Sequence, residues 1–454
     1  MNKPDALTLV IFGASGDLTR RKLMPALYLL YKAGRLPRRF AVLGMARTSY
    51  DDDRFRTSIR EGLLSFVRPD EVDEKAIHAF LSCLHYLSAD PSKPEAYAEL
   101  RIRLEEIDRT IDNPHNYLYY LATPPLLYGV IPRHLKAEGL NRDGDGFRRI
   151  VVEKPFGYDL SSALELNRIY LDAFREEQIY RIDHFLGKET VQNILALRFA
   201  NSVFEPLWNR NYIDYVELTA VENMGIGTRG GFYDGVGTLR DMVQNHLAQL
   251  LAVTAMEPPA AFDASGFRNE VVKVYQSLTP LTGEDIRHSV VRGQYMASEG
   301  RKGYREEEQV PTLSRTETYL AMRLELNNWR WGGVPFYIRT GKQMPTKVSE
   351  IVIHFKPAPY SLFRCEGGTF PVPNRLVIRI QPNEGIVLRL GMKKPGEGFE
   401  VLPMDMDFSY AELGRLPTED AYARLIEDCI AGDPTLFIRS DAVESGWRFF
   451  DPIL

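Results

Sequence analysis

The stretch "LTLVIFGASGDL", residues 7–18, restricts the fold more than any other part of the sequence. Its unbroken apolar run is typical of a strand buried on both faces, and the glycine turn after it leads into the helix-forming stretch 23–34. A strand followed at once by a turn and a helix begins a βαβ unit. The pattern is repeated by further short apolar runs at 40–46, 116–123 and 148–157. The sequence therefore predicts a doubly wound, Rossmann-like α/β domain over residues 1–180.

A second domain is expected because 454 residues exceed what one hydrophobic core usually supports. Beyond residue 181, the helical stretches 191–204 and 238–256 are accompanied by strand candidates with few helices between them. In "RLVIRIQ", every second residue from Leu376 to Ile380 is aliphatic, as in a sheet with one drier face. Residues 181–454 are therefore predicted to form an α+β domain with a large, mainly antiparallel sheet.

The composition argues against several classes of protein. A net charge of -5 gives no general reason to attract nucleic acid or an anionic membrane. Cys83, Cys365 and Cys429 are far apart and form no CxxC pair, so neither a disulfide framework nor a metal site is expected. The run "LTLVIF" is interpreted as a strand rather than a signal peptide, and no stretch approaches transmembrane length. We expect a cytoplasmic protein.

The turn from Gly13 to Leu18 is a candidate dinucleotide site. Glycines let the backbone approach a pyrophosphate, and the helix that follows supplies N–H donors. The turn departs from G-x-G-x-x-G at Ser15 and Leu18, so a purely structural turn is the alternative. The second strand ends with Arg47 and Thr48, where an NAD site would carry an acid. This favours NADP, with a plain surface arginine as the alternative.

Three further places in the sequence carry candidate chemistry. The segment "RIDHFLGKE", residues 181–189, crowds five ionisable side chains, which predicts either a solvated turn or a pocket that binds an anion and orients a base. Lys154 precedes Pro155 at the end of a predicted parallel strand, where ligands of doubly wound folds gather, although a loop lysine is the default. His246 lies in a predicted helix, where histidines are usually structural, but hydride transfer from an alcohol needs a base of near-neutral pKa.

Taken together, these stretches resemble the glucose-6-phosphate dehydrogenase family. The matching segments occur in the family's order and are "GASGDLTRRKL", "EKPFG", "RIDHFLGKE", "RGGFYD", "RDMVQNH", "RTGK" and "NRLVIRIQPNE". The last segment, "RSDAVESGWRFFDPIL", is similar to the family's carboxyl-terminal end. One such match arises easily by chance, whereas all of them in order do not.

The resemblance implies oxidation of β-D-glucose 6-phosphate at C1 to 6-phospho-D-glucono-1,5-lactone, with hydride transfer to NADP and NAD as a weaker alternative. This is the first oxidative step of the pentose phosphate pathway. It assigns His246 as general base and Asp183 as the carboxylate that orients it. The implied substrate residues are Lys154, His184, Lys188, Glu222, Asp241, Lys342 and Lys347, with His184 and Lys188 at the phosphate and Glu222 and Asp241 at sugar hydroxyls. The implied cofactor residues are Gly13, Ser15, Gly16, Asp17, Leu18, Arg47 and Lys154.

Two departures from the family pattern stand out. Phe185 replaces a tyrosine that many members carry, and Val387 stands where an aromatic residue accompanies a second, structural NADP in some members. We therefore do not expect that second site. A homodimer or dimer of dimers is expected, both from the resemblance and from the exposed edges of a large sheet.

Two other functions remain open on the sequence. One is a dehydrogenase of another, unphosphorylated hexose, but a neutral sugar would not need the cluster of lysines and a histidine. The other is a catalytically silent NADP-binding regulator, which loss of His246 or Asp183 would have suggested; both residues are present.

Overall fold

The computed structural model describes two compact units. The described residues are 3–360, 362–365, 374–396, 398–410 and 421–454. Those of the first unit fall within 1–187, 262–268 and 419–444, and those of the second within 188–261, 269–418 and 445–454. Each unit is built around its own sheet.

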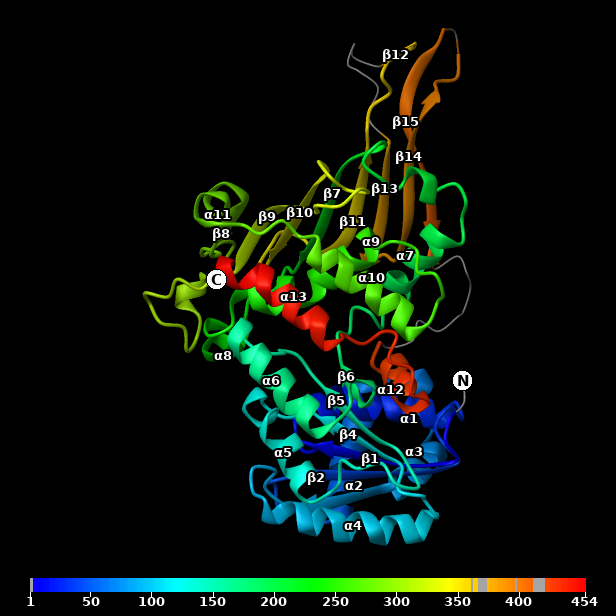
Figure 1. The fold of residues 1–454 in the computed structure, drawn as a ribbon, viewed down its shortest axis with the longest axis vertical. Coiled ribbons are helices and arrows are strands. Elements are labelled where there is room, and N and C mark those ends of the chain that lie inside the picture. Colours follow the sequence, from blue (N-terminus) through cyan, green and yellow to red (C-terminus); the bar gives the residue numbers. More distant parts are fainter. Residues whose placement is uncertain (1–2, 361, 366–373, 397, 411–420) are drawn as a thin grey trace. The chain divides into compact units, whose positions relative to one another are not determined.

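A six-stranded parallel sheet forms the centre of the first unit (Figure 1). Its strands are β1 (Ala6–Phe12), β2 (Arg39–Ala46), β3 (Leu84–Ser88), β4 (Tyr117–Leu121), β5 (Arg148–Val152) and β6 (Ile179–Arg181). They lie in the order β3-β2-β1-β4-β5-β6, and every neighbouring pair is parallel. All residues of β1 and β4 are buried, as their apolar runs predict. The prediction of a Rossmann-like fold is confirmed.

Helices connect these strands. Three of them, α1 (Met24–Lys32), α2 (Asp52–Phe66) and α3 (Glu74–Ser82), pack on one another. Helix α4 (Glu95–Ile111) contacts β1 and β2, and α5 (Val130–Ala137) packs on α6 (Leu160–Ala173). The sequence marks several of the starts: Asp51 caps α2 by accepting from the Arg54 N–H, and Asp159 forms a capping box with Ser162 in α6. The remaining helical segments are η1 (Thr19–Leu23), η2 (Pro69–Glu71), η3 (Pro125–Leu127), η4 (Glu176–Gln178) and α12 (Ala421–Ala431).

A nine-stranded sheet forms the centre of the second unit (Figure 1). Its strands are β7 (Ile213–Val221), β8 (Val290–Gly293), β9 (Tyr319–Glu325), β10 (Pro335–Gly341), β11 (Val348–Phe355), β12 (Arg364–Cys365), β13 (Arg375–Gln381), β14 (Gly385–Lys393) and β15 (Glu400–Ser409). Their order is β12-β15-β14-β13-β11-β7-β10-β9-β8. Only the pairs β7–β10 and β12–β15 are parallel among these described strands. The prediction of a large, mainly antiparallel sheet is confirmed.

One face of this sheet is apolar and covered by helices. Leu376, Ile378 and Ile380 of β13 are each at most 2% exposed, which confirms the predicted alternation. Helix α7 (Glu189–Phe199) contacts β13, and η7 (Leu239–Leu247) contacts β7 and β10. The other helical segments within the described residues are η5 (Glu205–Leu207), η6 (Gly227–Arg229), α8 (Gly230–Asp234), α9 (Ala248–Ala255), α10 (Ala264–Gln276), α11 (Gly283–Ser289), η8 (Tyr304–Glu306), α13 (Ser440–Phe450) and η11 (Asp451–Ile453).

Two of the helical segments, η1 and η7, are π-helices. A π-helix has i→i+5 hydrogen bonds and is rare, but it occurs frequently at functional sites. The sequence predicted one ordinary helix over 238–256, whereas the structure has a π-helix over 239–247 followed by the α-helix α9. The segment η1 directly follows the glycine turn, and η7 contains His246.

Candidate active site

The glycine turn lies where β1 ends, between β2 and β4, which is the point at which the strand order of the first sheet reverses. Ligands of doubly wound folds bind at such a switch point. Gly13 has φ +85° and a Cβ there would lie 2.2 Å from the Ala122 carbonyl oxygen after β4, so only glycine fits. The Thr19 hydroxyl donates to the Gly13 carbonyl at 3.2 Å and closes the turn.

Arg47 and Thr48 follow β2 and lie beside this turn. The Thr48 hydroxyl donates to Ser15 Oγ at 2.8 Å, and the Thr48 carbonyl accepts from the hydroxyls of Tyr86 at 2.9 Å and Ser88 at 3.2 Å. Both Arg47 and Thr48 are exposed. The hydroxyl of Thr48, the residue after Arg47, thus links the segment predicted to bind a 2′-phosphate to the turn predicted to bind the pyrophosphate.

Lys154 follows β5 at the same edge of the sheet, and its peptide bond to Pro155 is cis. The preceding residue, Glu153, is 8% exposed and accepts a hydrogen bond from the Tyr120 hydroxyl at 2.6 Å. Burial raises the pKa of the Glu153 carboxyl, against the opposing effects of that bond and of the Lys154 charge. Lys154 therefore directly follows a buried, hydrogen-bonded acid in the chain, which restrains the backbone at this position.

Asp183 and His184 follow β6, the last strand of the first sheet. Asp183 is 1% exposed and its Oδ1 accepts from the Phe185 N–H at 2.9 Å. The His184 ring is half-buried, meets the Phe185 ring edge-on at 5.2 Å and lies parallel to the Tyr422 ring at 6.4 Å. A buried carboxylate and a partly exposed imidazole exclude the simple solvated turn as the interpretation of this segment.

Lys188 belongs to the second unit, together with Glu222, Asp241, His246, Lys342 and Lys347. The Lys188 ammonium donates to Gln381 Oε1 at 2.8 Å, and the Gln381 amide in turn donates to Ser349 Oγ at 3.0 Å. Gln381 was not singled out from the sequence. Its position before Pro382 at the end of β13 was the available signal, and that peptide bond is also cis.

Lys342 is the centre of a cluster of charged side chains. Its ammonium lies 2.6 Å from Glu222 Oε2, 3.2 Å from Asp241 Oδ2 and 5.3 Å from the centre of the Tyr233 ring. Lys342 is 5% exposed, whereas the side chains of Glu222 and Asp241 are 42% and 25% exposed, so a buried ammonium pairs with two carboxylates that water still reaches. Lys347, further along the same loop, is exposed.

His246 lies in the π-helix η7 and is 1% exposed. Its backbone N–H donates to the side-chain oxygen of Asn245 at 2.6 Å. The same helix carries Asp241, so η7 supplies one partner of Lys342 and the predicted base.

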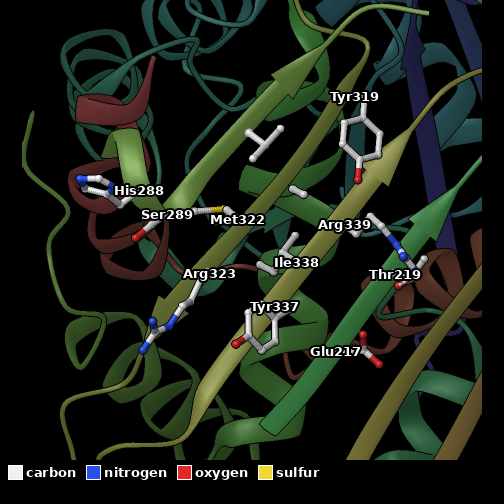
Figure 2. A pocket seen from close by; sticks show the side chains of 12 residues that line it. Glu217, Thr219, His288, Ser289, Tyr319, Met322, Arg323, Tyr337, Ile338 and Arg339 are labelled. Carbon is white, nitrogen blue, oxygen red and sulfur yellow. Dashed lines mark hydrogen bonds between the residues drawn. The ribbon is translucent and has the colours of Figure 1, made fainter. Parts of the chain in front are cut away.

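A separate pocket of about 350 Å³ lies against the other face of the second sheet (Figure 2). Side chains from β7, β9 and β10 line it, among them Thr219, Tyr337 and Arg339, and Arg339 donates to the Thr219 hydroxyl at 3.3 Å. None of the residues predicted for substrate or cofactor lines this pocket.

Comparison with known proteins accounts for both units. The family model "Glucose-6-phosphate dehydrogenase, NAD binding domain" matches residues 10–193, and "Glucose-6-phosphate dehydrogenase, C-terminal domain" matches residues 195–454. The chain belongs to the glucose-6-phosphate dehydrogenase family. Its first domain is therefore one that binds a nicotinamide cofactor.

Relatives and solved structures of the glucose-6-phosphate dehydrogenase family match the whole chain. It is 52% identical to the glucose-6-phosphate 1-dehydrogenase of Aggregatibacter actinomycetemcomitans, covering 100% of this chain and 91% of that one. It is 42% identical to the glucose-6-phosphate 1-dehydrogenase of Bacillus subtilis, and that match covers 100% of this chain and 92% of the relative. A solved glucose-6-phosphate dehydrogenase in complex with its substrate glucose 6-phosphate has 35% identity and a TM-score of 0.92, covering 100% of this chain and 92% of that one. The Mycobacterium avium structure has 36% identity and a TM-score of 0.83, with coverage of 98% and 91%.

Among the described residues, no helix is both long and apolar enough to cross a membrane.

Proposed function

We propose that this protein oxidises β-D-glucose 6-phosphate at C1 to 6-phospho-D-glucono-1,5-lactone and transfers the hydride to NADP. The observation that carries the proposal is the likeness over the whole chain to a solved glucose-6-phosphate dehydrogenase in complex with its substrate. The cluster of Lys342, Glu222 and Asp241 supports it, because two carboxylates held by a buried lysine can accept hydrogen bonds from sugar hydroxyls.

His246 is the general base in this proposal. Its imidazole takes the proton of the C1 hydroxyl as the hydride leaves C1, and Asp183 orients the ring and stabilises its protonated form. His184 and Lys188 bind the sugar phosphate through charge-assisted hydrogen bonds, and Gln381 holds the Lys188 ammonium in place. Lys154 and Lys347 add positive charge for the substrate.

The cofactor turn supports NADP, with NAD as a weaker alternative. When bound, the nicotinamide ring accepts the hydride. Gly13, Ser15, Gly16, Asp17 and Leu18 form the turn for the pyrophosphate, and the clash that a Cβ at Gly13 would cause fits a backbone shaped for close approach. Arg47 and Thr48 directly follow β2, at the place where an acid would suit a free 2′-hydroxyl, and the cation fits a 2′-phosphate better.

We further propose that the protein acts in the cytoplasm as a homodimer or dimer of dimers. The sheet described for the second unit is open, with β12 and β8 as its edge strands, which supports association of two copies.

The test is the absorbance of reduced cofactor, measured with glucose 6-phosphate, with glucose and with no sugar. The expected result is rapid reduction of NADP only with glucose 6-phosphate. Preference for glucose would favour the dehydrogenase of another hexose, and no reduction with either sugar would favour the silent regulator.

Two variants test the roles of single residues. His246→Asn should lower kcat by about 10²–10⁴-fold with KM little changed. Lys188→Ala should weaken the binding of glucose 6-phosphate far more than it weakens the binding of glucose, because only the former carries the phosphate.

A further inference from the structure

The π-helix η7 decides where two residues of the proposed site point. Asp241 and His246 are five residues apart. In an α-helix this spacing would place them about 140° apart around the axis. In a π-helix, whose hydrogen bonds join residues five apart, the same spacing places them on one side. The wider turn is therefore what allows both to serve one substrate.

The Asn245 side chain forms two hydrogen bonds with the backbone of that helix. Its side-chain amide donates to the Arg240 carbonyl at 2.9 Å, and its side-chain oxygen accepts from the His246 N–H at 2.6 Å. Asn245 is 7% exposed, so its polar atoms depend on partners inside the protein. Asparagine usually disfavours a helix because its side chain competes for backbone groups. In η7 the Asn245 side chain uses this ability to bridge the carbonyl five residues earlier and the N–H of the next residue.

The amino end of η7 is fixed independently. The Leu239 N–H donates to Glu317 Oε1 at 2.9 Å, and the Thr238 N–H donates to the Glu317 carbonyl at 3.1 Å. A change of helical form caused by loss of the Asn245 bridge would therefore be taken up between 240 and 247, where Asp241 and His246 lie.

We propose that Asn245 is a positioning residue whose side-chain amide keeps residues 239–247 in π-helical form and thereby orients His246 and Asp241 toward the sugar. The inference rests on the proposed function, because it gives Asn245 a role in the same reaction. Asn245 touches neither substrate nor cofactor in this role.

The test uses Asn245→Leu, which is similar in size but has no polar atoms, and Asn245→Asp, which keeps an acceptor for the His246 N–H but loses the donor to Arg240. Asn201→Leu is the control: Asn201 also donates to helical carbonyls, those of Ala196 and Leu197 at the end of α7. All are assayed as the full-length protein with glucose 6-phosphate and NADP.

Both Asn245 variants should lower kcat about 10- to 100-fold, because a small misplacement of the base is enough to do so. KM for NADP should stay the same, and the deuterium isotope effect with substrate labelled at C1 should rise as hydride transfer becomes limiting. Asn201→Leu should change neither. A crystal structure of Asn245→Leu should show an α-helix over 239–247.

Retention of the π-helix in that crystal structure, or a kcat and isotope effect equal to wild type in both Asn245 variants, would overturn the inference. Absence of activity in the wild-type protein would instead contradict the proposed function, and the crystal structure of the variant would still decide the role of Asn245.

Discussion

At the scale of single residues, Arg47 is the side chain on which the choice of cofactor depends. Arg47→Ala should raise KM for NADP about 10- to 100-fold, since a hydrogen bond to a charged group contributes roughly 1.5–3 kcal/mol. KM for NAD should change by no more than about twofold because NAD lacks the 2′-phosphate. Steady-state kinetics with each cofactor measures this. Arg54→Ala, an exposed arginine of α2, is the control, and equal effects on both cofactors would contradict the assignment.

Asp428 gives the stability a pH dependence of its own. It is 2% exposed in α12, and burial raises its pKa to about 7 although the Arg424 guanidinium lies 3.2 Å away. The folded state therefore binds this proton more tightly than the unfolded chain, whose carboxyl has its ordinary pKa. As pH rises through the ordinary pKa toward 7, the group costs stability, up to about 4 kcal/mol, and the cost is constant above pH 7.

The Asp428→Asn variant removes this titration. Its unfolding free energy minus that of the wild type should increase between about pH 4 and pH 7 and stay level at higher pH. Urea unfolding at a series of pH values measures the difference. A difference that does not vary with pH would show that Asp428 is ionised throughout in the folded protein.

At the scale of elements, the carboxyl end of α9 is closed by one buried arginine and two tryptophans. The Arg198 guanidinium donates to the carbonyls of Val253 at 3.1 Å, Thr254 at 3.0 Å and Met256 at 2.8 Å. The indole N–H groups of Trp208 and Trp331 donate to the carbonyls of Thr254 and Ala255, both at 2.8 Å. The last carbonyls of a helix have no partner within it, so these side chains satisfy them.

Arg198→Leu should lower the unfolding free energy by about 3–5 kcal/mol, because it removes the charged donor to three buried carbonyls and one of the two arginines that pair with Glu205. Burial lowers the pKa of Arg198 only to about 10, so the wild-type side chain is charged at neutral pH. The measurement is the urea midpoint with an unchanged m value. Arg287→Leu removes an exposed ion pair with Glu284 and should change stability by less than about 0.5 kcal/mol. Similar losses in both variants would contradict a special role for Arg198.

At the scale of the whole molecule, β15 presents two different faces. Asp405 and Asp407 form ion pairs with Arg389 and Arg379 on one face. On the other face, Met404 and Met406 alternate with them and are 55% and 64% exposed. Exposed apolar side chains gathered on one strand face are typical of a surface that another protein covers.

The protein should therefore have twice the monomer mass or more in solution, and the double substitution Met404→Asp and Met406→Asp should shift it toward monomer. Light scattering after size-exclusion chromatography measures the mass. Leu126→Asp, which changes an 89% exposed leucine of the first unit, is the control and should leave the mass unchanged. An unchanged mass in the methionine variant would place the contact between copies elsewhere.

Most strands of the two sheets were predictable from the sequence. Unbroken apolar runs such as 7–12 record burial on both faces, and alternation such as that of β13 records burial on one, so periodicity predicts these strands without knowledge of their neighbours. The strands β3, β6, β8, β12 and β15 were not predicted. In β3, apolar and polar residues are mixed over five positions, and in β15 Pro403 and two aspartates interrupt the pattern.

The tertiary structure alone decided which distant side chains meet and which helical form residues 239–247 adopt. Lys342 contacts Glu222, 120 positions away, and Lys188 contacts Gln381, 193 positions away. The pattern along the chain records how deeply each residue is buried, but not which residue it will touch. The backbone of the π-helix also forms hydrogen bonds with side chains, one of them with the carboxylate of Glu317 in a distant part of the chain, and the spacing of apolar residues does not record these contacts.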